Sequence, residues 1–206
     1  MKKMILFIFL LTLFLNVKAA EKSEATFKDQ LSASFGMSNI SYTQLQAAFS
    51  GSGAGSQTSE SGNVSAMIGN VDYEFFTKKR RSIFLKLTGS LLSSSMNKYY
   101  ALGTGMNWYF KGTGAYVTFK EPGLEATIFP LFRYYLGLNL NARYMVYTTK
   151  SDVRADVGVE LGGHAGIIYP VNAKRGYKAE FGIFKGMGIE TDSMNMQILL
   201  GITYFI

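Results

Sequence analysis

Apolar and polar residues alternate along most of this chain with a period of two, which is the pattern of a β-strand with two different faces. In residues 132–146, for example, Leu138 and Leu140 alternate with Asn139 and Asn141. No amphipathic helix has this period. The pattern recurs in segments separated by polar turns and predicts eight strands, at residues 30–37, 67–75, 83–91, 99–110, 132–146, 155–167, 177–189 and 194–206.

Two segments interrupt the alternation. Residues 39–63 contain a Gly-Ser-Gly-Ala-Gly run, and we interpret them as a flexible polar loop. Residues 111–129 contain Pro122 and Gly123, which break strands, and we interpret them as a long turn. Residues 116–119, Tyr-Val-Thr-Phe, could still form a short strand, so the strand count is left open at this point.

The length of the predicted strands favours a membrane-spanning fold. Transmembrane β-strands need about 9 to 11 residues, with apolar side chains toward lipid and polar or small ones toward the lumen. Backbone amides in hydrocarbon must all be paired, so the sheet has to close on itself. We therefore predict an all-β fold, a closed antiparallel transmembrane β-barrel of eight strands with an up-and-down meander. Even parity puts both termini on the periplasmic side and the loop at residues 39–63 outside.

The N-terminus has the three parts of a secretory signal peptide. Lys2 and Lys3 precede an apolar run of residues 4–15, and a small-residue cleavage site ends at Ala19. The domains expected are therefore a signal peptide, residues 1–19, and an outer-membrane barrel, residues 20–206. Removing the signal peptide lowers the formal net charge from +7 to +4, which gives little reason to expect a nucleic-acid partner. The chain has no cysteine, so disulfides do not stabilise it.

Aromatic residues make up 15% of the chain and are expected near the strand ends, as in the girdles of membrane barrels. In the predicted topology Trp108, Phe132 and Tyr177 fall at the periplasmic ends. A thinner upper girdle contains Phe35 and Tyr144, together with Tyr100.

The signal peptide, the eight alternating strands and residues 201–206, Gly-Ile-Thr-Tyr-Phe-Ile, resemble the small bacterial outer-membrane barrels similar to the transmembrane domain of outer-membrane protein A. That resemblance implies a bacterial outer-membrane location and contacts with outer-membrane lipid and lipopolysaccharide. It also implies a monomer whose last strand is recognised by the barrel assembly machinery during insertion. Ile206 stands where an aromatic residue is usual in that family.

The inward positions predict a polar network inside the barrel. An eight-stranded lumen is just wide enough for side chains, and enclosed charges need partners. We expect an ion-pair network that fills the lumen, although the same charges could line a constriction that passes ions. The predicted lumen network comprises Arg133, Asn139, Asn141, Arg143, Asp156, Glu160, His164, Lys178 and Glu180.

Catalytic chemistry is not predicted. His164 is the only histidine, so no cluster of ligands suggests a metal, and nothing in the sequence suggests a cofactor. A lipid hydrolase would need a serine near His164, whose predicted side faces the lumen. We therefore expect a non-enzymatic barrel with a structural or surface-interaction role through residues 39–63. The alternative is a small passive channel; the solute, ligand and surface partner are left open.

Overall fold

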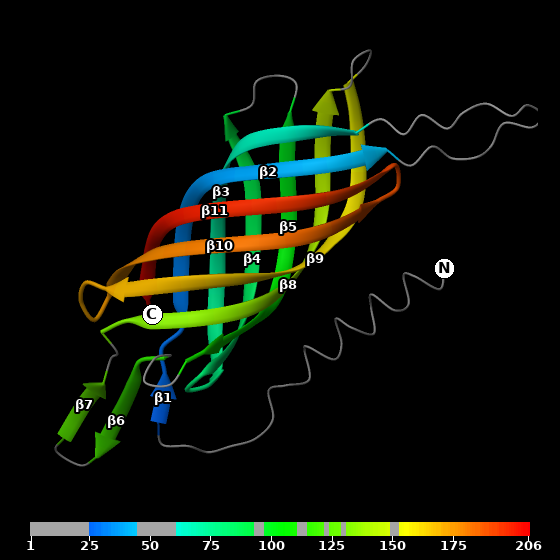
Figure 1. Cartoon of the computed structure of the whole chain (residues 1–206). Helices are drawn as coiled ribbons and strands as arrows, with labels where there is room; N and C mark the ends of the chain where they lie inside the picture. Colours follow the sequence, from blue (N-terminus) through cyan, green and yellow to red (C-terminus); the bar gives the residue numbers. More distant parts are fainter. Residues whose placement is uncertain are drawn as a thin grey trace, which may run out of the picture.

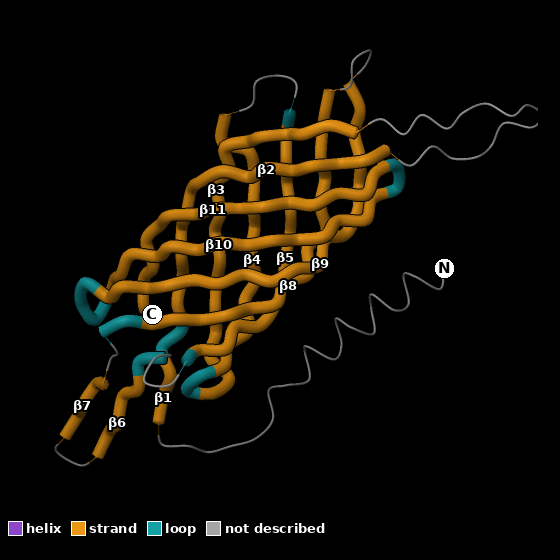
Figure 2. Tube along the Cα trace, viewed as in Figure 1, coloured by secondary structure: helices purple, strands orange, loops and turns teal. Residues whose placement is uncertain are grey.

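A computed structural model describes residues 25–44, 61–92, 97–110, 115–121, 124–128, 131–148 and 153–206. All regular secondary structure in these residues is β-strand (Figure 2). No helix in them is long and apolar enough to cross a membrane. The predicted signal peptide, residues 1–19, lies outside the described residues.

Eight strands form a closed antiparallel barrel (Figure 1). Each barrel strand pairs with the next one along the chain, and the first pairs with the last, from Gln30 opposite Phe205 to Gln44 opposite Thr191. The predicted all-β fold with eight up-and-down strands is therefore confirmed. The barrel strands are β2 (Gln30–Gln44), β3 (Ser61–Lys78), β4 (Arg81–Leu92), β5 (Lys98–Tyr109), β8 (Arg133–Thr148), β9 (Val153–Pro170), β10 (Arg175–Gly188) and β11 (Thr191–Phe205).

A separate three-stranded sheet lies at one end of the barrel, near the C-terminus (Figure 1). It contains β1 (Ala25–Phe27), β6 (Val117–Glu121) and β7 (Leu124–Ile128), in the order β1-β6-β7. We call this the proximal end of the barrel and the opposite end the distal end. The prediction that residues 111–129 form only a long turn was wrong, because the Pro-Gly pair separates two strands instead of excluding them. The extra strand near residues 116–119 exists but stays outside the barrel.

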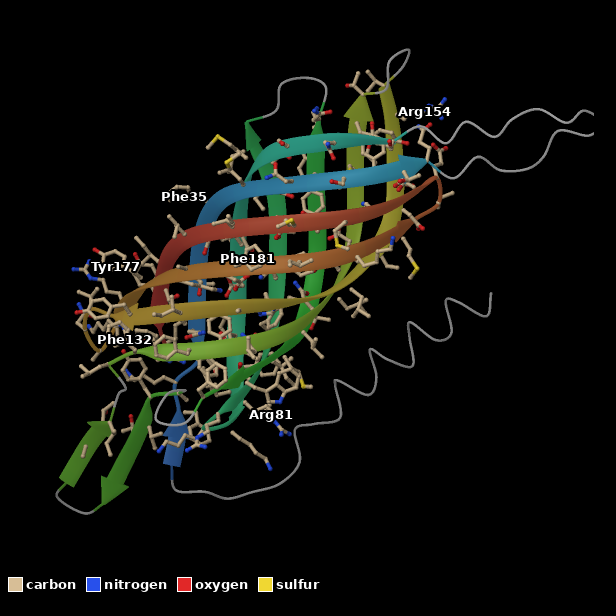
Figure 3. All side chains as sticks on the ribbon, viewed as in Figure 1. Phe35, Arg81, Phe132, Arg154, Tyr177 and Phe181 are labelled. Carbon is tan, nitrogen blue, oxygen red and sulfur yellow. The ribbon has the colours of Figure 1, made fainter. Side chains whose placement is uncertain are left out.

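The alternation sets the two faces of the barrel wall. In β8, Asn139 and Asn141 are buried, whereas Leu136 and Leu138 are about half exposed. Figure 3 shows Phe35, Phe181 and Tyr177 on the outside of the wall. An exposed apolar belt around a closed barrel is typical of a surface that contacts lipid. It includes Met37, Met67, Val71, Leu87, Leu102, Leu161, Ile183, Ile198 and Leu200.

Toward the distal end the two faces of β2 and β3 exchange polarity. Ile40 and Val64 are almost fully buried, whereas Asn39 and Ser65 are exposed and joined by a 2.6 Å hydrogen bond. We call residues 39–44 of β2 and 61–66 of β3 the inverted section. Its outer face is polar and its inner face apolar, as in a water-soluble barrel.

The inverted section corrects the predicted loop at residues 39–63. Residues 39–44 and 61–63 belong to strands, and residues 45–60 lie outside the described residues. The period of two continues through residues 39–44, but the apolar residues now face inward. A pattern search for apolar residues on the outer face therefore ended this strand too early.

Candidate functional site

The barrel lumen is the candidate site. The structure places all nine residues of the predicted network inside it, and none is more than 6% exposed. Eight are hydrogen-bonded into three clusters along the barrel, while the side-chain amide of Asn139 has no hydrogen-bond partner among the described residues. The nine are Arg133, Asn139, Asn141, Arg143, Asp156, Glu160, His164, Lys178 and Glu180.

The central cluster contains two lysines and two carboxylates. Lys178 Nζ lies 3.0 Å from both carboxylate oxygens of Asp72 and 3.2 Å from Glu180 Oε2. Lys86 Nζ lies 2.6 Å from Glu180 Oε1, and the Tyr135 hydroxyl donates a 2.7 Å hydrogen bond to Oε2. Because β4 and β10 are not neighbours in the barrel, the Lys86–Glu180 pair crosses the lumen.

The distal cluster is built on Arg143. Its Nη2 lies 3.1 Å from Asp156 Oδ2, and its Nη1 lies 3.8 Å from Glu160 Oε1. The Tyr99 hydroxyl donates a 2.6 Å hydrogen bond to Glu160, and Arg143 donates a 2.7 Å hydrogen bond to Ser193. All three ionic side chains are completely buried, so their attraction is weakly screened.

The proximal cluster surrounds Glu74. This carboxylate accepts hydrogen bonds from the Tyr109 hydroxyl at 2.8 Å and the Asn107 amide at 2.9 Å. It also accepts hydrogen bonds from the side chains of Gln30 and Ser82. Four side-chain donors therefore satisfy this one buried carboxylate.

Arg133 lies in an aromatic cage beside the proximal cluster. Its Nη1 donates a 2.8 Å hydrogen bond to the Gln30 side chain. Cation–π attraction adds to this contact, because a guanidinium near ring faces is stabilised by their negative charge density. The Arg133 Cζ atom lies 4.9 to 5.7 Å from the ring centroids of Phe76, Tyr109, Tyr116 and Phe205.

Tyr116 connects the proximal end of the barrel to the three-stranded sheet. Its ring is fully buried and packs edge-on against Phe205, with centroids 4.3 Å apart. Burial raises the pKa of Tyr116 to about 12, against an opposing effect of Arg133, so the hydroxyl is protonated at neutral pH. It donates a 3.3 Å hydrogen bond to the Asn172 carbonyl.

Two apolar clusters lie at the ends of the lumen. The proximal plug, around the Arg133 cage, comprises Phe76, Tyr109, Ala115, Tyr116, Tyr135, Ile168 and Phe205. The distal plug, formed by the inverted section and by residues of β3, β5, β8 and β11, comprises Ile40, Tyr42, Val64, Ala66, Ile68, Tyr99, Ala101, Met145, Tyr147 and Leu199. Charged and apolar groups therefore share both ends of the lumen, since Tyr99 of the distal plug bonds Glu160 and the rings of the proximal plug surround Arg133.

His164 lies inside the lumen, away from the lipid-facing wall. Its Nε2 is 2.7 Å from the Asn107 side-chain oxygen, and its ring packs edge-on against Phe84. No serine or threonine hydroxyl is hydrogen-bonded to it among the residues the structure describes. In the same residues, no group of three or more histidine, cysteine, aspartate or glutamate side chains is arranged to hold a metal ion.

Sequence reasoning missed several members of the clusters. Asp72, Glu74 and Lys86 occupy inward positions of the alternation, and their charge could have placed them in the network. Tyr99 and Tyr135 carried no such signal, because tyrosine is equally expected in an interfacial girdle. The residue that each one contacts across the lumen cannot be read from the order of the strands.

Comparisons with known proteins identify the fold. No protein-family model matches the sequence, and no curated protein matches it as a relative. Among solved structures, Neisserial surface protein A (NspA) matches with a TM-score of 0.57 and 11% identity, over 88% of this chain and 99% of that chain. The outer membrane protein OprG from Pseudomonas aeruginosa matches with a TM-score of 0.52 and 10% identity, over 89% and 98%. The chain therefore has the fold of the small eight-stranded outer-membrane β-barrels.

Proposed function

We propose that this chain is a non-enzymatic protein of the bacterial outer membrane whose lumen is closed to ions and which has a structural or surface-interaction role. One observation carries this proposal: paired charges along the lumen and an apolar plug toward each end together fill its interior. A conducting pore needs a continuous path of water. Entry of an ion here would require both plugs and at least one charged cluster to rearrange.

The proposed orientation places the proximal end in the periplasm. The exposed basic residues Lys79, Arg80 and Arg81 lie at this end, and Lys174 and Arg175 lie at the turn between β9 and β10. Their positive charge complements the phosphates of the inner leaflet. Figure 3 shows Arg81 and Arg154 at opposite ends of the barrel. The polar outer face of the inverted section then lies beyond the hydrocarbon on the cell surface.

The partners proposed for this location are outer-membrane lipid and lipopolysaccharide around the barrel, and the barrel assembly machinery during insertion. The protein is proposed to act as a monomer without a cofactor. The hydroxyl and amide groups of Asn39, Ser41, Asn63 and Ser65 supply the surface available for interactions outside the membrane.

Planar-bilayer recording of the refolded barrel tests the closed lumen. Heat-modifiable migration on a gel and protection from protease would first verify that the barrel is folded and inserted. We expect no steady openings in concentrated KCl. Reproducible openings whose conductance rises with salt would refute the proposal and support a small passive channel instead.

A second experiment tests the absence of catalysis. His164→Ala should leave the lipid A composition of cells unchanged, because among the described residues His164 contacts the luminal side chains of Asn107, Phe84 and Tyr135. A change in lipid A that follows this substitution, with the barrel still heat-modifiable, would contradict the non-enzymatic proposal.

A further inference from the structure

A groove runs across the outer wall of the barrel over five neighbouring strands, β2, β3, β4, β5 and β8, with a volume of about 830 Å³. Its centre is formed by Gly69 and Gly89, which are directly opposite each other in β3 and β4. Ala33 and Ala142 border it at the two outer strands. The two glycines leave a gap in a wall that otherwise carries leucine, valine and aromatic side chains.

The strand register gives the groove one continuous edge. Ala33, Val71, Leu87, Leu102 and Ala142 are successive partners across the five strands. This row forms one edge. The stacked rings of Tyr100 and Tyr144, with centroids 6.4 Å apart, continue the row of the two glycines and border the groove over β5 and β8.

The two glycines keep the groove open. A Cβ atom at Gly89 would come within 3.3 Å of the Tyr100 ring, and one at Gly69 within 2.6 Å of Leu91. A larger side chain at either position would therefore fill the groove beside Tyr100 or Leu91. Arg143 borders the same space from the luminal side, where its guanidinium is held by Asp156 and Glu160.

The position and chemistry of the groove indicate its occupant. Its outward residues are uncharged, and it is continuous with the apolar belt that contacts lipid. Four steps between strands of about 4.8 Å make it about 19 Å long. Because strands of such barrels tilt by about 35 to 45°, a groove across them descends by about 11 to 13 Å, close to the roughly 15 Å of one hydrocarbon leaflet.

We propose that this groove holds one acyl chain of a membrane lipid along the barrel wall. The inference rests on the proposed membrane location. Burying methylene groups against Gly69, Gly89 and the leucines of the edge restricts that chain relative to the other lipids around the barrel. The ligand class is a saturated or unsaturated hydrocarbon chain, independent of the headgroup attached to it.

Electron spin resonance of a phospholipid labelled near the end of one acyl chain tests this proposal. The barrel is refolded into vesicles of phosphatidylcholine containing the labelled lipid, and the motionally restricted fraction is measured. Ala142→Leu and Gly89→Leu fill the groove, while Ala155→Leu makes the same kind of change at an exposed position of β9 outside it. Heat-modifiable migration verifies each variant, and Ala142→Leu carries the test where Gly89→Leu does not fold.

We expect the groove variants to lose one restricted chain per barrel relative to the wild type, with Ala155→Leu unchanged. Equal restricted fractions in all four proteins would overturn the proposal. So would a wild-type dimer, detected by crosslinking in the vesicles and abolished by Ala142→Leu, because a second copy would then occupy the groove. Ion conductance by the wild type would refute the closed lumen without changing the restricted-lipid result, so the two proposals fail separately.

Discussion

Replacing Arg143 by methionine should destabilise the barrel strongly, because it leaves two buried carboxylates without a cation. Asp156 and Glu160 lie four residues apart on β9, and both approach the Arg143 guanidinium, at 3.1 and 3.8 Å. With an effective dielectric constant of about 20, these contacts correspond to attractions of about 5 and 4 kcal/mol before desolvation is subtracted. Removing one partner of a buried ion pair typically costs about 3 to 5 kcal/mol, which is the loss expected here.

The matched variant removes all three charges. Arg143→Met combined with Asp156→Asn and Glu160→Gln leaves no isolated ion in the distal cluster. Because neutral replacement of a buried ionic group is often nearly neutral in stability, this variant should recover most of the loss, to within about 2 kcal/mol of the wild type.

Urea unfolding in lipid vesicles measures these differences. Trp108 is the only tryptophan in the chain and lies on β5, so its fluorescence reports the transition without an added probe. In a water-filled lumen the same pairs would be screened and worth no more than about 1 kcal/mol. A loss below about 1 kcal/mol for Arg143→Met, or no recovery in the triple variant, would refute the argument that the lumen is closed and dry.

Three further predictions concern the wall and the proximal end. Leu138→Arg, in the apolar belt, should lower the free energy of unfolding by about 2 to 4 kcal/mol. Ser41→Arg, on the outer face of the inverted section, should change it by less than about 0.5 kcal/mol. Equal losses of the two variants in urea unfolding would show that the inverted section lies in hydrocarbon. Gly36→Val should reduce heat-modifiable barrel because a Cβ there overlaps the Ile198 carbonyl, while Gly163→Ala, whose Cβ meets only the Gly137 carbonyl at 3.6 Å, should not. Tyr116→Ala should speed limited proteolysis of the β6–β7 hairpin several-fold without unfolding the barrel, because Tyr116 packs in the proximal plug. Thr118→Ala removes a 3.1 Å hydroxyl contact to Thr127 and should change that rate little. Equal rates in the two variants would show that Tyr116 does not hold the hairpin against the barrel.

The barrel was predictable because its strands follow one rule along most of their length. In β8 the alternation of Leu138 and Leu140 with Asn139 and Asn141 fixes which face meets lipid, and a slip of one residue would bury the wrong set. The neighbours Arg143 and Glu160 could also be brought close by strand order alone, since β8 and β9 are consecutive barrel strands.

Contacts across the lumen were not predictable in the same way. Lys86 and Glu180 meet because of the diameter and stagger of the closed sheet, which no single strand encodes. The inverted section was not predicted because the alternation was expected to place apolar side chains on the outer face along the whole strand. Asn39 and Ser65 on that face instead have the polarity of residues that contact water. The hairpin of β6 and β7 was missed because Pro122 and Gly123 were taken to exclude strands, whereas they stand between two strands that pair with each other.

The pairing of β2 with β11 has a consequence for how the protein folds. It joins Gln30 to Phe205, so the last pairing in the barrel connects nearly the largest sequence separation the chain allows. Contacts of this kind form slowly, because the entropy of closing a long loop is lost before any bond is gained. Until β2 and β11 pair, both strands have apolar side chains and unpaired backbone amides, and exposed edges of this kind promote aggregation. A newly exported chain should therefore depend on a carrier until its final strand has been delivered.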